Sequence, residues 1–164
     1  MATHDHFPMF IDTKGKKVVV VGGGKIAERR IHTLVHFSFD VTVRSEDITQ
    51  EIQQLVDAGT IHYEQGSFDP EKPEQYADLF FDAYMVLACT DDRTVNQQIG
   101  RICKEHDILV NVCDAQDEST FWFPAIALND ELTMGLVGNG KSHETVRKAA
   151  SQLRHIIEKR LYKA

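Results

Sequence analysis

Short apolar runs alternate with amphipathic stretches over the first two thirds of the chain. The runs at 18–21, 83–90 and 108–114 are almost continuously apolar, which is typical of strands buried on both faces of a sheet. Two further runs, at 40–44 and 60–64, are rich in β-branched and aromatic residues and predict additional strands. The pattern therefore predicts five strands before residue 115.

The stretches between these runs carry apolar residues at helical spacing. After the first run, Ala27, Ile31 and Leu34 fall at i, i+4 and i+7, on one face of a helix. Residues 48–56 and 92–106 show the same periodicity. Buried strands that alternate with amphipathic helices predict an α/β fold, with a Rossmann-like parallel sheet covered on both faces.

The pattern changes after residue 114. Two β-rich runs, 120–128 and 132–138, are separated by only three polar residues and predict a β-hairpin. From Ser142 onward apolar residues recur at helical spacing, which predicts one long amphipathic helix with Ser142 as its N-cap. A hairpin plus one helix leaves apolar surface exposed, and a second copy of the chain would cover it.

We therefore divide the sequence into two expected domains. Residues 1–113 are expected to form the Rossmann-like domain, and residues 114–164 a dimerisation segment of hairpin and C-terminal helix. The expected assembly is a homodimer.

Charge and hydropathy limit the classes of partner. The formal net charge of −7 argues against duplex nucleic acid as the main partner. No apolar run approaches the roughly 20 residues that span a bilayer, and the first ten residues lack a signal pattern. We expect a soluble, cytoplasmic protein with no nucleic-acid partner and no membrane contact.

The charge is unevenly distributed along the chain. Residues 141–164 carry seven basic and two acidic side chains, a net of +5, whereas the remaining residues carry −12. This basic segment could receive an anionic ligand or an acidic partner surface, or it could be a solvated helix face.

The cysteines and histidines give no sign of a metal site. The sequence has three cysteines, Cys89, Cys103 and Cys113, and they lack C-x-x-C spacing. Neither a disulfide framework nor a zinc site is therefore expected, and we expect all three to be buried thiols. None of the histidine pairs has convincing ligand spacing.

The three glycines after the first strand carry the clearest chemical signal. Residues 22–27, Gly-Gly-Gly-Lys-Ile-Ala, satisfy the pattern G-x-G-x-x-A. Gly22 would permit the tight turn, Gly24 would let the backbone approach a pyrophosphate, and Ala27 would allow close packing of helix on strand. The following helix N-terminus would present amide groups to the phosphates, so we expect a dinucleotide site.

The choice of dinucleotide depends on the end of the second strand. Glu46 and Asp47 lie just past it and could hold the ribose of NAD, whereas Arg44 and Ser45 are closer and could accommodate the 2′-phosphate of NADP. A third interpretation is that all four are ordinary loop residues with no role in binding. We favour NAD, mainly from the following resemblance.

Several separated stretches together resemble one family. "FPMFIDTKGKKVVVVGGGKIAERRI", "LACTDDRTVNQQI", "ILVNVCDAQ", "FWFPAI" and "GNGKS" occur in the order and approximate spacing of the precorrin-2 dehydrogenase/sirohydrochlorin ferrochelatase family, the N-terminal module of siroheme synthase. The resemblance covers about residues 7–161. It implies a homodimeric oxidoreductase of siroheme and porphyrin biosynthesis that uses NAD to oxidise the tetrapyrrole precorrin-2 to sirohydrochlorin, with Fe²⁺ insertion in some members.

The resemblance also assigns residues of the nucleotide site and the catalytic base. It places Gly22, Gly24, Lys25, Ile26 and Ala27 at the pyrophosphate.

Thr90 and Asp91 would line the same cleft, and Asp114 matches the family's catalytic aspartate. Asp114 ends an apolar strand, where ligands gather in open α/β sheets, and Phe121, Trp122 or Phe123 could desolvate it and raise its pKa. A turn cap is the alternative role for an aspartate at such a position.

The "GNGKS" turn is similar to the family's glycine-rich turn beside the tetrapyrrole. The resemblance implies substrate-binding roles for Asn139, Gly140, Lys141, Ser142 and Arg147. The turn departs from the family pattern at Gly138, where serine is frequent, and at His143, where proline is frequent. Basic side chains there would suit a polycarboxylate substrate.

Length is the largest departure from the family. Longer members continue with further helices that cover the active site, whereas this sequence ends at residue 164 and is truncated relative to them. Dehydrogenation is therefore expected to survive more readily than chelation. A non-catalytic sensor of NAD(H) remains the alternative function.

Overall fold

The computed structural model describes residues 6–72, 77–140 and 142–160. The chain forms two compact units. We call Asp12–Phe121 the sheet unit and Met1–Ile11 together with Trp122–Ala164 the hairpin unit. Within the described ranges, no helix is both long and apolar enough to cross a membrane.

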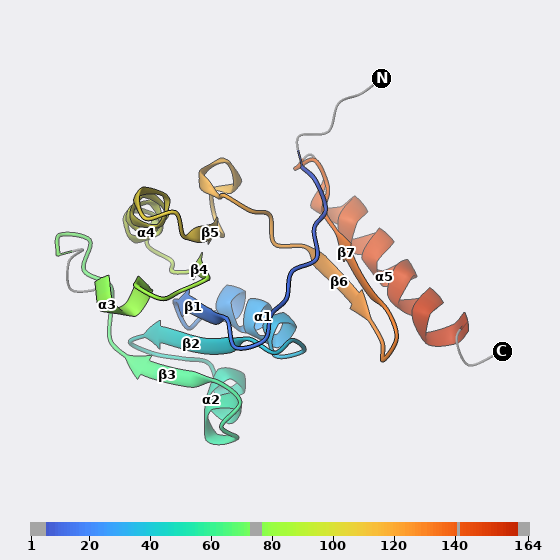
Figure 1. Cartoon of the computed structure of the whole chain (residues 1–164), viewed down its shortest axis with the longest axis horizontal. Helices are drawn as coiled ribbons and strands as arrows, with labels where there is room; N and C mark the ends of the chain where they lie inside the picture. The colour runs from blue at the N-terminus through green and yellow to red at the C-terminus, as the bar shows by residue number, and fades with distance from the viewer. Residues whose placement is uncertain (1–5, 73–76, 141, 161–164) are drawn as a thin grey trace. The chain divides into compact units, whose positions relative to one another are not determined.

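A five-stranded parallel sheet with strand order β3-β2-β1-β4-β5 forms the centre of the sheet unit (Figure 1). Its strands are β1 (Lys17–Val21), β2 (Asp40–Ser45), β3 (His62–Gln65), β4 (Met85–Ala88) and β5 (Leu109–Val112). The predicted parallel α/β architecture is confirmed. The apolar runs 83–90 and 108–114 extend beyond β4 and β5 because their last residues leave the ladder at its carboxyl edge.

The connections between the strands are mostly the predicted helices. They are α1 (Lys25–Leu34), α2 (Gln50–Asp57), α3 (Ala77–Phe80), α4 (Arg93–Glu105) and the 3-10 turn η2 (Gln116–Glu118). Side-chain caps fix the N-termini of two helices. The Thr49 side chain accepts a hydrogen bond from the Ile52 amide at the start of α2, and the Asp92 side chain accepts hydrogen bonds from the amides of Thr94 and Val95 at the start of α4. The sequence pattern did not predict α3 or η2, which are too short to display a helical period.

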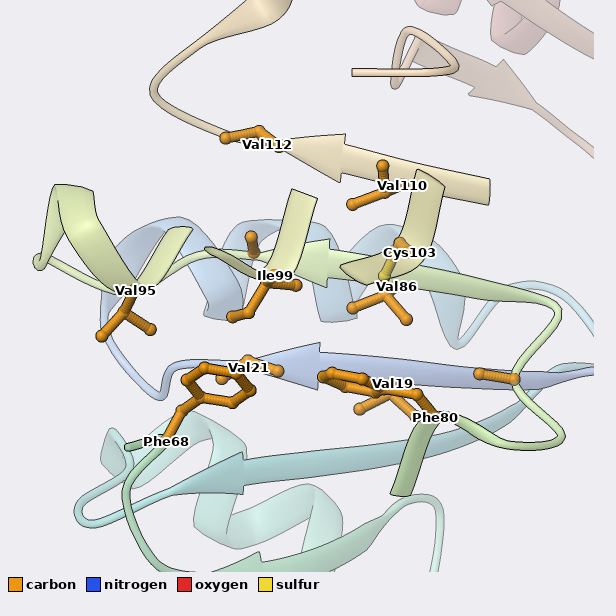
Figure 2. Packing of buried hydrophobic residues seen from close by; sticks show 12 residues of the cluster. Val19, Val21, Phe68, Phe80, Val86, Val95, Ile99, Cys103, Val110 and Val112 are labelled. Atoms are coloured by element: carbon orange, nitrogen blue, oxygen red, sulfur yellow. The ribbon is translucent and has the colours of Figure 1, made fainter. Parts of the chain in front are cut away.

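The core of the sheet unit follows from the alternation of side chains along β1. Val19 and Val21 join one cluster with α4, and Figure 2 shows Val95 and Ile99 of α4 on the same side of the sheet as Phe68. Each fully buried aliphatic side chain contributes about 1.5–3 kcal/mol to folding. This packing fixes the strand ends, and therefore the loops that follow them.

The segment after β5 stays with the sheet by covering its edge. The Val110 amide donates a hydrogen bond to the Thr120 hydroxyl at 2.8 Å, and the Val112 amide donates one to the Ser119 hydroxyl at 2.9 Å. These bonds satisfy amides of an edge strand that would otherwise be open. The sheet unit accordingly extends to Phe121. The domain boundary expected between residues 113 and 114 stays a prediction.

The hairpin unit contains the predicted antiparallel pair and the predicted helix. They are β6 (Ala125–Leu128), β7 (Thr133–Leu136) and α5 (His143–Arg160). Ala150 and Ile157 of α5 are buried, and Arg154 Nε donates to the carbonyl of Ile126 on β6 at 2.9 Å. Ser142 Oγ accepts the amide of Thr145 at 3.2 Å, which confirms the expected N-cap.

Candidate functional site

The strand order creates a switch point between β1 and β4. The chain crosses from β1 to β2 on one side of β1 and returns on its other side as β4. In open parallel sheets, ligands bind at such a point, outside the carboxyl ends of the strands. The glycine turn after β1 and the loop after β4 meet there, because the Cys89 amide donates to the Val21 carbonyl at 2.8 Å.

Gly22 is fixed by the backbone around it. Its φ of +112° belongs to the left-handed side of conformational space, and its amide donates to the carbonyl of Arg44 at 2.8 Å. A Cβ added here would lie 2.5 Å from the carbonyl oxygen of Cys89. The turn therefore requires glycine at this position for both conformation and space.

The next two glycines differ sharply from each other. A Cβ at Gly23 would lie 2.0 Å from the carbonyl oxygen of Asp47, so Gly23 packs against the loop that follows β2. Gly24 is exposed, and an added Cβ would meet no atom within 4 Å. Gly24 is also the N-cap of α1 and supplies no side-chain cap. The backbone at the start of α1 is thus accessible to an anion, as a pyrophosphate requires.

The first turn of α1 divides its side chains between core and surface. Ala27 is fully buried, whereas Ile26 is 45% exposed beside the turn. Lys25 Nζ lies 3.0 Å from Glu28 and 3.6 Å from Glu51. The hydrogen bond to Glu28 holds the pKa of Lys25 above its ordinary value. A bound phosphate would therefore compete with these carboxylates for a fully charged Lys25.

The end of β2 offers groups for a ribose. Arg44 Nη1 lies 3.6 Å from the Glu64 carboxylate, and the guanidinium also packs on Gly66. The Tyr63 hydroxyl lies 3.1 Å from the carbonyls of Ser45 and Glu46, to which it donates.

Glu46 follows β2 and is exposed, as is Asp47. Arg44 is thus engaged by β3 and the residue that follows it. Among the described residues, neither acidic side chain has an ion-pair partner.

The loop after β4 is held by one buried amide. Asn96 of α4 is fully buried and accepts hydrogen bonds from the Thr90 amide at 3.1 Å and the Thr90 hydroxyl at 2.7 Å. Asn96 Nδ2 donates in turn to the Thr90 carbonyl at 3.0 Å. Asp91 follows and is exposed. Sequence reasoning missed Asn96, although a polar residue next to the apolar stripe of α4 was its signal.

Asp114 follows β5 at the same carboxyl edge. Its carboxylate lies 3.6 Å from Arg93 Nη1, and the side chain is 36% exposed. Arg93 also forms an ion pair with Glu118.

This cation is the group that faces the Asp114 carboxylate within the sheet unit, and the aromatic lining expected beside Asp114 stays a prediction. Phe121 contributes its carbonyl, which accepts from Asn111 at 3.2 Å, and Trp122 and Phe123 belong to the hairpin unit. The cation is available because α4 begins at Arg93, just after the β4 loop, and β4 neighbours β5. No sequence signal distinguished Arg93 from an ordinary surface arginine.

The structure groups the predicted residues into two sets. One set lies along the carboxyl edge of the sheet unit: Gly22, Gly24, Lys25, Ile26, Ala27, Arg44, Ser45, Glu46, Thr90, Asp91 and Asp114. The other set belongs to the hairpin unit: Asn139, Gly140, Ser142 and Arg147. Lys141 lies outside the described residues.

The second set surrounds the start of α5. Gly140 has a φ of +79°, and a Cβ at Gly138 would lie 2.6 Å from Val146, so the turn packs closely on the helix. Arg147 is exposed on α5. Over the described part of the chain, no cluster of three or more His, Cys, Asp or Glu side chains could hold a metal ion.

Comparison with known proteins gives consistent matches. A family model described as "Putative NAD(P)-binding" matches residues 9–125. The chain is 36% identical over 154 residues to a protein of Ruminiclostridium josui named "Probable multifunctional siroheme biosynthesis protein HemA", covering 93% of this chain and 28% of that protein. It is 33% identical over 153 residues to a siroheme synthase of Photorhabdus laumondii, covering 93% of this chain and 31% of that enzyme.

A solved structure shares the fold. The chain matches a structure titled "SirC, precorrin-2 dehydrogenase" with a TM-score of 0.73 at 23% identity, covering 92% of this chain and 70% of that one. The chain spans less than a third of the length of the two curated relatives it matches.

Proposed function

The chain belongs to the NAD(P)-binding family whose model matches residues 9–125, and we propose that it is an NAD-dependent dehydrogenase that oxidises precorrin-2 to sirohydrochlorin in siroheme biosynthesis. One observation carries this proposal: an accessible glycine turn and a strand-end carboxylate, Asp114, occupy the same carboxyl edge of one parallel sheet. The names of its relatives supply the substrate.

The residues of the edge fit a dinucleotide. The start of α1 offers amide groups and partial positive charge beside the exposed Gly24, and Lys25 adds a full charge. The Thr90 loop, held by Asn96, forms the opposite wall of the switch point. These groups would hold the pyrophosphate and position the nicotinamide half.

The side chains after β2 favour NAD over NADP. A 2′-phosphate would need a cation, but Arg44 is already paired with Glu64 and packed on Gly66. Glu46 and Asp47 are exposed at the same edge, and their carboxylates would repel a phosphate and accept hydrogen bonds from a ribose hydroxyl.

Asp114 is the proposed general base. When bound, NAD⁺ supplies the hydride acceptor for the oxidation. Asp114 Oδ1 would take the proton that the tetrapyrrole loses in the same oxidation, and Arg93 orients that carboxylate through the 3.6 Å contact. Because the side chain is 36% exposed, the proton can be passed on to solvent.

Substrate binding and assembly involve the hairpin unit. Precorrin-2 is a polycarboxylate, and we assign its carboxylates to the turn that contains Asn139 and Gly140 and to the exposed Arg147 of α5. A homodimer built through the hairpin unit would cover exposed side chains such as Ile156, which is 42% exposed. Fe²⁺ insertion, where it occurs, would use iron as a substrate.

Turnover of precorrin-2 tests the proposed function. Purified protein is incubated anaerobically with enzymatically generated precorrin-2 and either NAD⁺ or NADP⁺, and sirohydrochlorin is followed by its absorbance. Sirohydrochlorin formation with NAD⁺ at a higher kcat/KM than with NADP⁺ is the expected result. Tight NAD⁺ binding without turnover would instead indicate a sensor of NAD(H).

A further inference from the structure

Two cysteines lie side by side at the carboxyl edge of the sheet. Cys89 directly follows β4, Cys113 directly follows β5, and the last paired residues of these strands are Ala88 and Val112. The two Sγ atoms are 2.8 Å apart, and both cysteines are free thiols. The proposed dehydrogenase chemistry uses neither of them.

The backbone geometry allows a disulfide. Neighbouring strands lie about 4.8 Å apart, within the roughly 4.4–6.8 Å between Cα atoms that disulfides bridge. A disulfide bond is about 2.05 Å long, so the sulfurs would need to approach by about 0.8 Å. Rotation of the two side chains with a small strand shift can supply that movement.

The two thiols have different chemical characters. Cys113 is half-buried, and its pKa is lowered to about 7 by the hydrogen bond from Cys89 and then by the guanidinium of Arg30 on α1. Cys89 is buried, and the same pairing together with burial raises its pKa. Cys113 is therefore the nucleophile and Cys89 the resolving thiol.

The third cysteine is an internal control. Cys103 on α4 is fully buried, and burial raises its pKa to about 12. It belongs to the hydrophobic cluster beside Val86 and Val110 (Figure 2). Its thiol is expected to be inert under conditions that oxidise the pair.

We propose that Cys89 and Cys113 form a redox-active modification site that hydroperoxides convert to a disulfide and that small dithiols reopen. The Cys113 thiolate attacks one peroxide oxygen, the O–O bond breaks, and the leaving oxygen takes a solvent proton as water or alcohol. Cys89 then attacks the sulfenic sulfur of Cys113, the S–S bond forms, and the hydroxyl leaves with the Cys89 proton as water. The thiols lose two electrons and the peroxide gains two.

Formation of the disulfide between Cys89 and Cys113 should change the geometry of the proposed nucleotide site. Cys89 follows β4, the strand between β1 and β5, and its carbonyl oxygen would lie 2.5 Å from a Cβ added at Gly22. A disulfide draws the end of β4 toward β5, away from the glycine turn, and Thr90 moves with it. The oxidised protein therefore binds NAD⁺ more weakly. This consequence rests on the proposed function, whereas formation of the disulfide does not.

Peptide mapping of the wild-type protein tests the pair. Reduced protein is treated with a small excess of hydrogen peroxide, alkylated, digested and analysed by mass spectrometry, with and without later dithiothreitol. The expected product links Cys89 to Cys113, leaves Cys103 unoxidised, and disappears on reduction. Oxidation confined to Cys103, or Cys113 sulfinic acid without a Cys89 link, would overturn the proposal.

Calorimetric titration with NAD⁺ tests the consequence on the same samples. Oxidation is expected to raise the Kd for NAD⁺ by about fivefold or more, and dithiothreitol to restore it. Cys89→Ala and Cys113→Ala should abolish the response to peroxide. An unchanged Kd in fully linked protein would overturn the coupling. Absence of NAD⁺ binding by reduced protein would refute the proposed function and the coupling, and the peptide map would still decide on the pair.

Discussion

The side-chain amide of Asn96 pairs with the backbone of Thr90 as one strand pairs with another. Asn96 Oδ1 accepts the Thr90 amide at 3.1 Å, and Asn96 Nδ2 donates to the Thr90 carbonyl at 3.0 Å. This contact joins the core helix α4 to the loop after β4. A nucleotide site at that loop therefore depends on a residue that is itself fully buried.

Replacing Asn96 by leucine tests this dependence. Asn96→Leu keeps the volume but leaves the Thr90 amide and carbonyl unpaired, so we expect a loss of about 2–4 kcal/mol in the free energy of unfolding and about tenfold weaker NAD⁺ binding. Urea denaturation and calorimetry measure the two effects. Gln97→Leu, at the neighbouring exposed position, is the matched control and should change neither quantity appreciably. Equal behaviour of the two variants would contradict the assigned role.

Substitutions at two glycines of the turn should affect folding stability and NAD⁺ binding separately. Gly22→Ala should cost about 2–4 kcal/mol of folding free energy, because the position has positive φ and no room beside the Cys89 carbonyl. Gly24→Ala should leave thermal stability nearly unchanged, since its Cβ meets no protein atom, but should weaken NAD⁺ binding about tenfold. Thermal denaturation with and without NAD⁺ distinguishes the two. A Gly24→Ala protein that binds normally would place the nucleotide elsewhere.

Cys113 and Cys103 should become reactive at different pH values. Because the pKa of Cys113 is lowered to about 7, its thiolate fraction and alkylation rate should rise between about pH 6 and 8, below the range of an ordinary thiol. The pKa of Cys103, raised to about 12, keeps that thiol unreactive throughout this interval. Timed iodoacetamide labelling with mass spectrometry reports both. Faster labelling of Cys103 than of Cys113 at pH 7 would be inconsistent with the structure.

Arg93 should act through Asp114 rather than on the cofactor. Arg93→Ala removes the cation 3.6 Å from the Asp114 carboxylate, so kcat should fall about tenfold or more while the Kd for NAD⁺ changes little. Arg93→Lys should recover part of the rate. Steady-state kinetics together with NAD⁺ titration separate this positioning role from a structural one. Equal losses in both variants, accompanied by lower thermal stability, would indicate that Arg93 only supports the fold.

The sequence pattern predicted the fold well because strand and helix periodicities are local properties. The apolar run 18–21 and the helical spacing of Ala27, Ile31 and Leu34 determine β1 and α1 without reference to the rest of the chain. The cap at Ser142 was equally local. α3 escaped prediction because four residues cannot show a period.

Contacts between distant residues could not be predicted in this way. Cys89 and Cys113 are far apart in sequence and meet because β4 and β5 are neighbours in the sheet. The spacing of residues along the sequence does not predict which strands become neighbours. The pairing of Arg93 with Asp114 has the same origin, because α4 begins just after the β4 loop and Asp114 follows β5. The glycine turn could be recognised from the sequence because the pattern G-x-G-x-x-A occupies one contiguous stretch, 22–27.

The most direct test of the account is the single-turnover rate of precorrin-2 oxidation by Asp114→Asn with saturating NAD⁺. The exposed Asp117→Asn provides the matched loss of charge on the adjacent 3-10 turn. We expect Asp114→Asn to lower the rate at least about a hundredfold with an unchanged Kd for NAD⁺, and Asp117→Asn to remain near wild type. A wild-type rate for Asp114→Asn would contradict the assignment of Asp114 as the base.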